Sequence, residues 1–227
     1  MYNEHNYLKD STLYNKEHNI EFWNIPKNAM TSIISDLGFV WTSSSQLPKD
    51  RKIFCVIRNP LDRFLSSYMM CRNQLYGPSL SVYNCRYIDP RSSMFNIEDD
   101  INQGYSDYIN EILTNGPFDA HNMSQTWYIN DHLAVDAEGM YWGGVVHTYP
   151  NYLRVFSNIT DFISMDNLNE GLSKLFNKEI ILDKLNTTSI LPSIKKSLDE
   201  ITKKNKTKIL AYYKEDQLLY DKVNKIK

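Results

Sequence analysis

Residues 53–57, Ile-Phe-Cys-Val-Ile, are the segment that most constrains how this chain can fold. The run is continuously apolar and bounded by polar residues, a pattern typical of a short strand buried on both faces. Arg58, Asn59 and Pro60 follow at once. Asn59 is a favourable N-cap residue and Pro60 a favourable first helical residue. The segment therefore predicts a buried parallel strand that leads through a tight turn into a helix.

The residues after Pro60 have the spacing of an amphipathic helix. Apolar residues recur at i, i+3, i+4, i+7 and i+8, which places them on one helical face. These residues are Leu61, Phe64, Leu65, Tyr68 and Met69. A strand, a turn and a helix in succession form the basic unit of a parallel α/β sheet.

Other segments continue this alternation of strands and helices. Strands are predicted over 20–25, 145–146 and 153–156, and helices over 31–37 (ended by Gly38), 101–113, 124–129, 168–176 and, as one or two helices, 194–224. Residues up to Asn19 are expected to be irregular, and 73–97 to form a long surface excursion. The alternation predicts an α/β fold with a central parallel sheet flanked by helices, whose ligands bind beyond the carboxyl ends of the strands.

Length and composition fit one globular domain. The chain has 227 residues, of which 42% are hydrophobic, so we expect a single domain over residues 1–227. The formal net charge of −2 argues against a nucleic-acid-binding protein, which usually carries a strongly basic stripe. No apolar run reaches the roughly 18–20 residues of a membrane span, and no apolar signal region is visible at the N-terminus. We therefore expect a cytoplasmic protein with no membrane span.

The turn after the first predicted strand is a candidate anion site. It comprises Lys27, Asn28, Ala29, Met30, Thr31 and Ser32. A turn that leads into a helix N-terminus directs backbone N–H groups at one point, and the helix dipole adds partial positive charge there. Lys27 adds a full charge, and Thr31 and Ser32 add hydroxyl donors, which together suit a phosphate or sulfate group. The open alternative is a surface lysine beside an ordinary helix start.

Arg58 and Ser66 form a second candidate anion site. Arg58 ends the buried strand just before a helix, where a guanidinium can bind a phosphate through two parallel hydrogen bonds, a geometry that lysine cannot copy. Ser66 lies two turns into the helix, off the centre of its apolar face, and can present its hydroxyl to the same group. The open alternative is a structural salt bridge between Arg58 and Asp62, with Ser66 an ordinary helix residue.

Together, these two segments resemble the sulfotransferases that use 3′-phosphoadenosine 5′-phosphosulfate (PAPS), particularly the branch of Golgi carbohydrate sulfotransferases and their bacterial and viral relatives. Residues 26–33 look like that family's 5′-phosphosulfate loop, and residues 58–68 look like its 3′-phosphate motif almost position by position. Weaker similarities follow in order at His121-x-x-x-Gln125, at 161–168, at 185–187 and at Tyr213-x-x-Asp216-x-x-x-Tyr220. Met30 and Asp166 depart from the family pattern, Met30 because it is bulky for its position.

The resemblance implies a P-loop-NTPase-like sulfotransferase architecture, with PAPS as cofactor and no metal. Lys27 and the backbone N–H groups of residues 28–31 would hold the 5′-phosphosulfate, and Arg58 and Ser66 the 3′-phosphate. An acceptor hydroxyl, on a carbohydrate or a small molecule, would attack the sulfur in line, while Lys27 stabilises the charge that grows on the leaving oxygen. His121 is the first candidate for the general base. The other candidates are His147, His18, Glu21 and Asp119.

Two other classes of function stay open at this point. A nucleotide kinase would share the strand–loop–helix geometry, but the Gly-x-x-x-x-Gly-Lys-Ser/Thr pattern of such enzymes is absent from this chain. A non-catalytic binding or structural protein could use the same fold, because a fold does not determine a function.

Overall fold

The computed structural model describes residues 11–25, 27–76, 97–116, 122–129, 140–142, 145–147, 159–182 and 192–225. Its central element is a five-stranded sheet. The strands of this sheet are β1 (Ser11–Asn15), β2 (Ile20–Trp23), β3 (Val40–Ser43), β4 (Lys52–Ile57) and β7 (Asp161–Ser164). A separate antiparallel pair joins β5 (Met140–Trp142) to β6 (Val145–His147).

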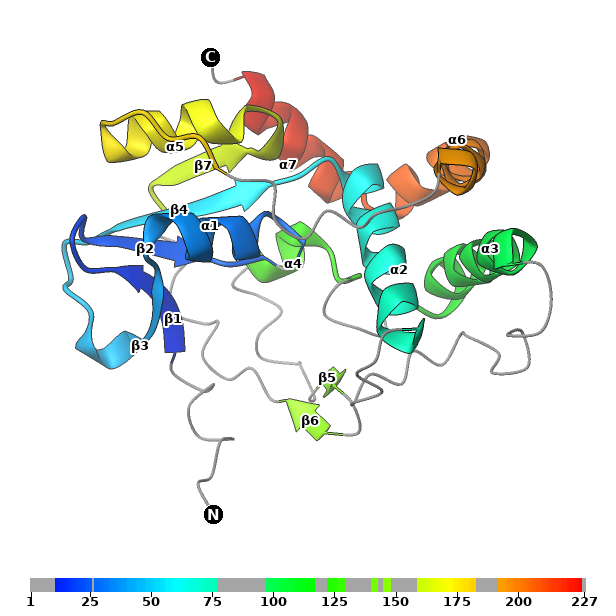
Figure 1. The fold of residues 1–227 in the computed structure, drawn as a ribbon, viewed down its shortest axis with the longest axis horizontal. Coiled ribbons are helices and arrows are strands. Elements are labelled where there is room, and N and C mark those ends of the chain that lie inside the picture. The colour runs from blue at the N-terminus through cyan, green and yellow to red at the C-terminus, as the bar shows by residue number, and fades with distance from the viewer. Residues whose placement is uncertain are drawn as a thin grey trace.

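Helices surround the sheet, as the sequence predicts for an α/β fold. They are α1 (Met30–Leu37), α2 (Pro60–Tyr76), α3 (Ile97–Asn115), α4 (Gln125–Ile129), α5 (Leu168–Phe176), α6 (Pro192–Tyr212) and α7 (Lys214–Lys225). Figure 1 shows α1, α5 and α7 beside the sheet, with α3 and α6 on the far side of α2. None of the helices in the described ranges is long and apolar enough to cross a membrane.

The sheet is mixed, so the prediction of a purely parallel sheet is wrong. The strand order is β3-β1-β2-β4-β7. β2, β4 and β7 run parallel, with Phe22 opposite Phe54 and Cys55 opposite Phe162. β1 runs antiparallel to both of its neighbours, with Leu13 between Phe22 and Trp41.

β1 accounts for this difference, because β3 runs in the same direction as β2, β4 and β7. The sequence pattern revealed neither β1 nor β3. β1 lies in the segment expected to be irregular; although it is largely polar, Leu13 and Tyr14 are buried. Asn19, with φ of 53°, adopts the left-handed conformation that asparagine tolerates, and the chain reverses into an antiparallel hairpin. β3 is an edge strand on which Val40 and Trp41 are 58% and 55% exposed, so it carries no pattern of burial.

β4 is buried on both faces, as its continuous apolar run predicts. Phe54 and Val56 face a core that the sheet shares with α1 and α5. Ile53, Cys55 and Ile57 alternate with them and face a second core, shared with α4 and α7. The strand is therefore fixed from both sides, and so is the position of its last residue.

A third core holds α2 against α3 and α6. Phe64, Tyr68 and Met69 are buried there, which confirms the predicted apolar face of α2. The Phe64 ring lies 5.1 Å from the ring of Tyr108, and the Tyr68 ring 4.8 Å from that of Tyr105, between centroids. This packing anchors the first half of α2 and holds its first turn at the edge of the sheet.

The helix boundaries follow the predictions closely. α5 has the predicted bounds, α3 is a few residues longer at both ends, and the stretch from 194 to 224 divides into α6 and α7. Gly38 ends α1 with φ of 64°, as predicted for a residue in the left-handed region. α2 continues to Tyr76, so residues 73–76, the first part of the predicted excursion, are helical. Residues 77–96 and the predicted strand 153–156 lie outside the described residues.

Candidate functional site

The two predicted anion sites lie at the ends of neighbouring parallel strands. In the strand order, β3, which the chain reaches from β2 by way of α1, lies to one side of β2. β7, which the chain reaches from β4 after α2, lies next to β4 in the other direction. The strand order therefore reverses between β2 and β4. In open α/β sheets, ligands bind at such a switch point, beyond the carboxyl ends of the strands. Lys27 follows β2 and Arg58 follows β4 at this position.

The β2–α1 loop, residues 27–29, has an unusual backbone. Lys27 and Ala29 both adopt left-handed conformations, with φ of 72° and 65°. Residues with a side chain rarely do so, at a cost of about 1–3 kcal/mol each. Ala29 is also the N-cap of α1, and its side chain makes no capping hydrogen bond of the kind that Ser, Thr, Asp or Asn would make. The loop thus departs from ordinary helix-start chemistry at the place where the sequence predicts an anion site.

Arg58 joins the two candidate sites directly. Its Nη1 donates a hydrogen bond of 3.0 Å to the carbonyl oxygen of Lys27. This contact uses one of the five N–H donors of a guanidinium. Burial lowers the pKa of Arg58, while the charges of Asp62 and Asp166 act in the opposite direction. Arg58 stays a cation under ordinary conditions, because the guanidinium pKa starts above 12.

The predicted alternative for Arg58, a salt bridge to Asp62, is not what the structure contains. Within the described part of the chain, the hydrogen bond of the Arg58 guanidinium goes to Lys27, and Asp62 affects it only through its charge. Asp62 is instead exposed in the first turn of α2. Ser66 is half-buried one turn further along, on the same helical face as Asp62.

α2 begins with a regular N-cap. The side chain of Asn59 accepts hydrogen bonds from the backbone N–H of Leu61 at 3.0 Å and of Asp62 at 3.4 Å. The carbonyl oxygen of Asn59 accepts the first intrahelical bond, from Arg63. Pro60 is the first helical residue, as predicted. This start leaves Arg58 as the last residue before a rigid helix.

Gln125 binds both strand ends through one side-chain amide. Its Oε1 accepts hydrogen bonds from the backbone N–H of Arg58 at 2.8 Å and from Nδ2 of Asn28 at 2.7 Å. Its Nε2 donates to the carbonyl of Arg58 at 2.8 Å. Gln125 and Asn28 are both fully buried. In the sequence, Gln125 stands out only as part of a weak family resemblance, which did not predict this role.

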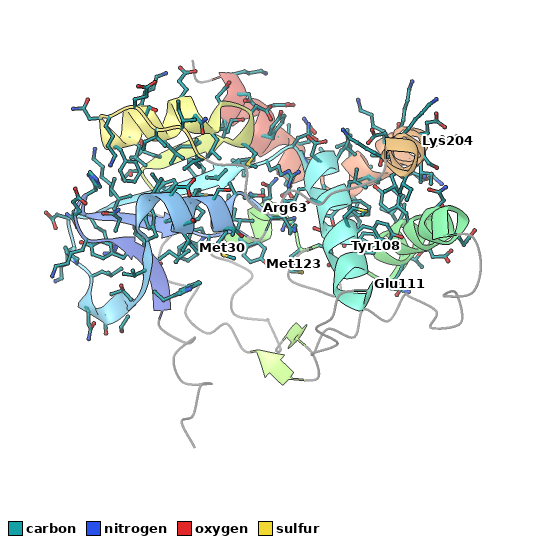
Figure 2. The ribbon with its side chains drawn as sticks, in the orientation of Figure 1. Met30, Arg63, Tyr108, Glu111, Met123 and Lys204 are labelled. Atoms are coloured by element: carbon teal, nitrogen blue, oxygen red, sulfur yellow. The ribbon has the colours of Figure 1, made fainter. Side chains whose placement is uncertain are left out.

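Asp216 of α7 holds the start of α4, and so the position of Gln125. Its two carboxylate oxygens accept hydrogen bonds of 2.7–2.9 Å from the backbone N–H groups of Gln125 and Thr126 and from the Thr126 hydroxyl. Asp216 is 1% exposed. Arg63 of α2 approaches the same segment, where its Nη1 donates to the carbonyl of Met123 at 2.6 Å. Figure 2 shows Arg63, Met123 and Met30 in the region between α1 and α2.

Another segment that resembles the sulfotransferase family, at the end of β7, lies at the same edge of the sheet. Asp166 follows β7 and accepts a hydrogen bond from the Tyr220 hydroxyl of α7. Between α6 and α7, the Tyr213 hydroxyl donates to the carbonyl of Asn122, just before α4. Burial raises the pKa of Tyr213, so this hydroxyl stays a donor at neutral pH. Segments far apart in the chain therefore meet around Arg58 and Gln125.

Two of the alternative general bases lie at the opposite edge of the sheet. Glu21 is in the first half of β2, where its carboxylate pairs with Arg51 and accepts a 2.8 Å hydrogen bond from the Thr12 hydroxyl. His18 is in the turn before β2 and packs edge-on against Phe176, at 4.9 Å between ring centroids. Neither side chain faces the region around Arg58.

The first candidate for the general base, His121, lies outside the described residues, as does Asp119. His147 lies on β6, but its side chain is outside the described part of the chain. The prediction of His121 as base therefore stays a prediction.

Comparisons of this chain with protein-family models, with curated proteins and with solved structures find no match.

Proposed function

We propose that this protein is a sulfotransferase that binds PAPS and transfers the sulfuryl group to a hydroxyl of a carbohydrate or small molecule, on a P-loop-like sulfotransferase architecture. One observation carries the proposal: the Arg58 guanidinium lies 3.0 Å from the Lys27 carbonyl. The two motifs that the resemblance assigns to the 3′-phosphate and the 5′-phosphosulfate are thus adjacent at the switch point of the sheet.

The residues present fit this cofactor. PAPS is anionic at both its 3′ and 5′ positions, and the chain supplies a cation from each of two neighbouring strand ends, Lys27 and Arg58. The first turn of α1 begins at this point, and the partial positive charge of a helix N-terminus favours an anion. Arg58 can engage a phosphate oxygen while it keeps its contact with Lys27, because a guanidinium has five N–H donors.

PAPS, when bound, supplies an activated sulfuryl group. Arg58 and Ser66 hold the 3′-phosphate, and Lys27 with residues 28–32 holds the 5′ end and stabilises negative charge on the leaving phosphate oxygen. Bound PAPS would supply its sulfuryl group to the acceptor oxygen, with the 5′-phosphate of the nucleotide as the leaving group. His121 takes the proton of the acceptor hydroxyl in this proposal.

Binding of the product nucleotide, adenosine 3′,5′-diphosphate (PAP), is the most direct test. We expect PAP to raise the melting temperature, because a ligand at about 100 times its Kd stabilises the folded state by about 2.7 kcal/mol. Adenosine 5′-monophosphate is the matched control, since it lacks the 3′-phosphate that Arg58 would bind. No shift with PAP would reject the proposal, and a larger shift with ATP and Mg²⁺ would favour a nucleotide kinase.

Transfer from labelled PAPS to glycans, phenols and small alcohols tests the activity itself. Lys27→Ala should abolish turnover on any acceptor found in this screen. Lys52→Ala is the matched control, because Lys52 is an exposed lysine at the opposite end of β4. Equal loss of turnover in both variants would show that the Lys27 effect is not local to the proposed site.

A further inference from the structure

We infer that Gln125 and Asp216 are positioning residues for the nucleotide, which set the geometry of Arg58 and of the β2–α1 loop without touching the ligand. The inference rests on the proposed function and adds residues that the proposed function does not use. The buried Gln125 amide nitrogen already donates to the Arg58 carbonyl, and Asp216 is a carboxylate whose two oxygens are engaged by α4.

Gln125 couples the two anion-binding segments to each other. A single amide makes three hydrogen bonds of 2.7–2.8 Å, two to the backbone of Arg58 and one to the side chain of Asn28. Its full burial excludes water from these bonds, which strengthens them. Gln125 therefore helps to fix the distance between the Arg58 backbone and the β2–α1 loop, together with the direct bonds from Asn28 to Val56 and from Arg58 to Lys27.

Asn28 is the link between Gln125 and the loop. Its Nδ2 donates to the Val56 carbonyl at 2.6 Å and to Gln125 at 2.7 Å, so its amide orientation is fixed by two acceptors. Its Oδ1 is buried and has no hydrogen-bond partner among the described residues. Buried acceptors are rarely left without a hydrogen-bond partner. The Asn28 side chain therefore forgoes one hydrogen bond while its Nδ2 holds the loop in position. Asn28 also stands between the two left-handed residues, Lys27 and Ala29.

Asp216 connects α7 to the start of α4, and so to Gln125 and its hydrogen bond with Asn28. Both of its carboxylate oxygens are engaged by the first residues of α4, Gln125 and Thr126. A carboxylate at a helix N-terminus with three donors is a strong capping arrangement. α7 packs on the second core of the sheet through Val223, so the helix that carries the Asp216 carboxylate is held in place.

If the role of Gln125 were purely structural, its substitution would lower only the stability of the fold. The test therefore compares substitutions of two buried amides. Gln125→Met removes the amide and keeps a similar volume without adding charge. Asn15→Leu is the matched control: Asn15 is also buried and bridges two backbone groups, Leu37 and His18, but at the opposite edge of the sheet. We expect both variants to lower the melting temperature. PAP affinity, measured by titration calorimetry well below both melting temperatures, should fall about tenfold or more only in Gln125→Met.

Asp216→Asn is a second variant, for which the direction of the change in PAP affinity is diagnostic. Removal of a buried negative charge near an anion site should strengthen PAP binding if only electrostatics acts. The positioning role predicts the opposite, a loss of about fivefold or more, because an amide cannot accept from all three donors of α4. Unchanged or tighter PAP binding in folded Asp216→Asn would overturn the inference, even if Gln125→Met does not fold.

A double-mutant cycle tests whether Gln125 acts through Arg58. In an Arg58→Ala background, Gln125→Met should weaken PAP by much less than in the wild-type chain, since residues in one network are not additive. Full additivity would contradict the inference. Its failure is distinct from that of the proposed function: a wild-type chain that does not bind PAP refutes the function, whereas a chain that binds PAP equally with and without Gln125 refutes only the inference.

Discussion

The two helices that begin at the candidate site start in opposite ways. α2 has an Asn59 cap with two side-chain hydrogen bonds and Pro60 at its first position. α1 has an alanine N-cap in the left-handed region and no side-chain cap. α2 has a preferred N-cap and a preferred first residue, whereas α1 lacks a capping side chain and has a left-handed residue at its N-cap.

The two helix starts therefore differ in role at this edge of the sheet: the start of α2 supports the candidate site, and the start of α1 forms part of it. Local rules of helix formation are broken mostly where a chain trades stability for a binding geometry. The start of α2 gives Arg58 a rigid base, and the start of α1 presents a strained backbone next to Lys27. We therefore expect substitutions at the α2 start to change stability with little effect on binding, and substitutions at the α1 start to change binding as well. Arg58 belongs to both, since it lies beside α2 and contacts the α1 loop.

The largest effect is expected from Arg58→Lys. The substitution keeps the charge and removes the forked donor geometry, so PAP affinity should fall by about 10–100-fold, equivalent to about 1.4–2.8 kcal/mol. Titration calorimetry of PAP with both chains measures this. Arg51→Lys is the matched control, because Arg51 pairs with Glu21 at the opposite edge of the sheet and should leave PAP affinity unchanged. Equal affinity in Arg58→Lys and the wild type would remove Arg58 from the site.

The parts of the fold with strong local patterns were predictable from the sequence. The continuous apolar run of β4 and the helical spacing after Pro60 predicted both elements, and α5 was predicted with its observed bounds. β1 and β3 were not predictable in this way. β1 is largely polar, and β3 exposes Val40 and Trp41, so neither shows the burial pattern on which strand prediction depends. Their pairing is a property of the whole sheet.

The candidate site was predictable in its two ends but not in what joins them. Parallel strand ends meet at one edge of a sheet, which is why Lys27 and Arg58 were expected to be close. Gln125 reaches Arg58 across 67 residues and Asp216 reaches Gln125 across 91 residues of sequence. No local periodicity signals a hydrogen bond over such a separation. The only sign of these residues was their place in the weaker segments of the family resemblance.

Asn59→Ala should cost about 1 kcal/mol of folding stability, because it removes the cap of α2. Chemical denaturation of the variant and of the wild type measures this loss. PAP affinity of the folded variant should stay within about twofold, which is less than 0.5 kcal/mol. A large loss of affinity with little loss of stability would reverse the assignment, and would place Asn59 among the binding residues instead of the supporting ones.

The smallest effect, and the sharpest comparison, concerns the two ends of α1. Ala29 and Gly38 flank this helix with almost the same φ, 65° and 64°. Ala29→Gly should stabilise the fold by about 0.5–1 kcal/mol, because glycine adopts this conformation without steric strain and is also the better N-cap. Gly38→Ala should destabilise it by about 1 kcal/mol, for backbone reasons alone, since a Cβ at Gly38 would meet no atom within 4 Å.

The binding consequence distinguishes these two positions. Ala29→Gly should weaken PAP by about two- to threefold although it stabilises the fold, because a more flexible loop must lose more conformational freedom when it binds. Gly38→Ala should leave PAP affinity unchanged, since it alters the end of α1 far from Lys27. Tighter PAP binding in Ala29→Gly would mean that the left-handed alanine is a cost to binding as well as to folding. The strained start of α1 would then have no functional explanation in the proposed site.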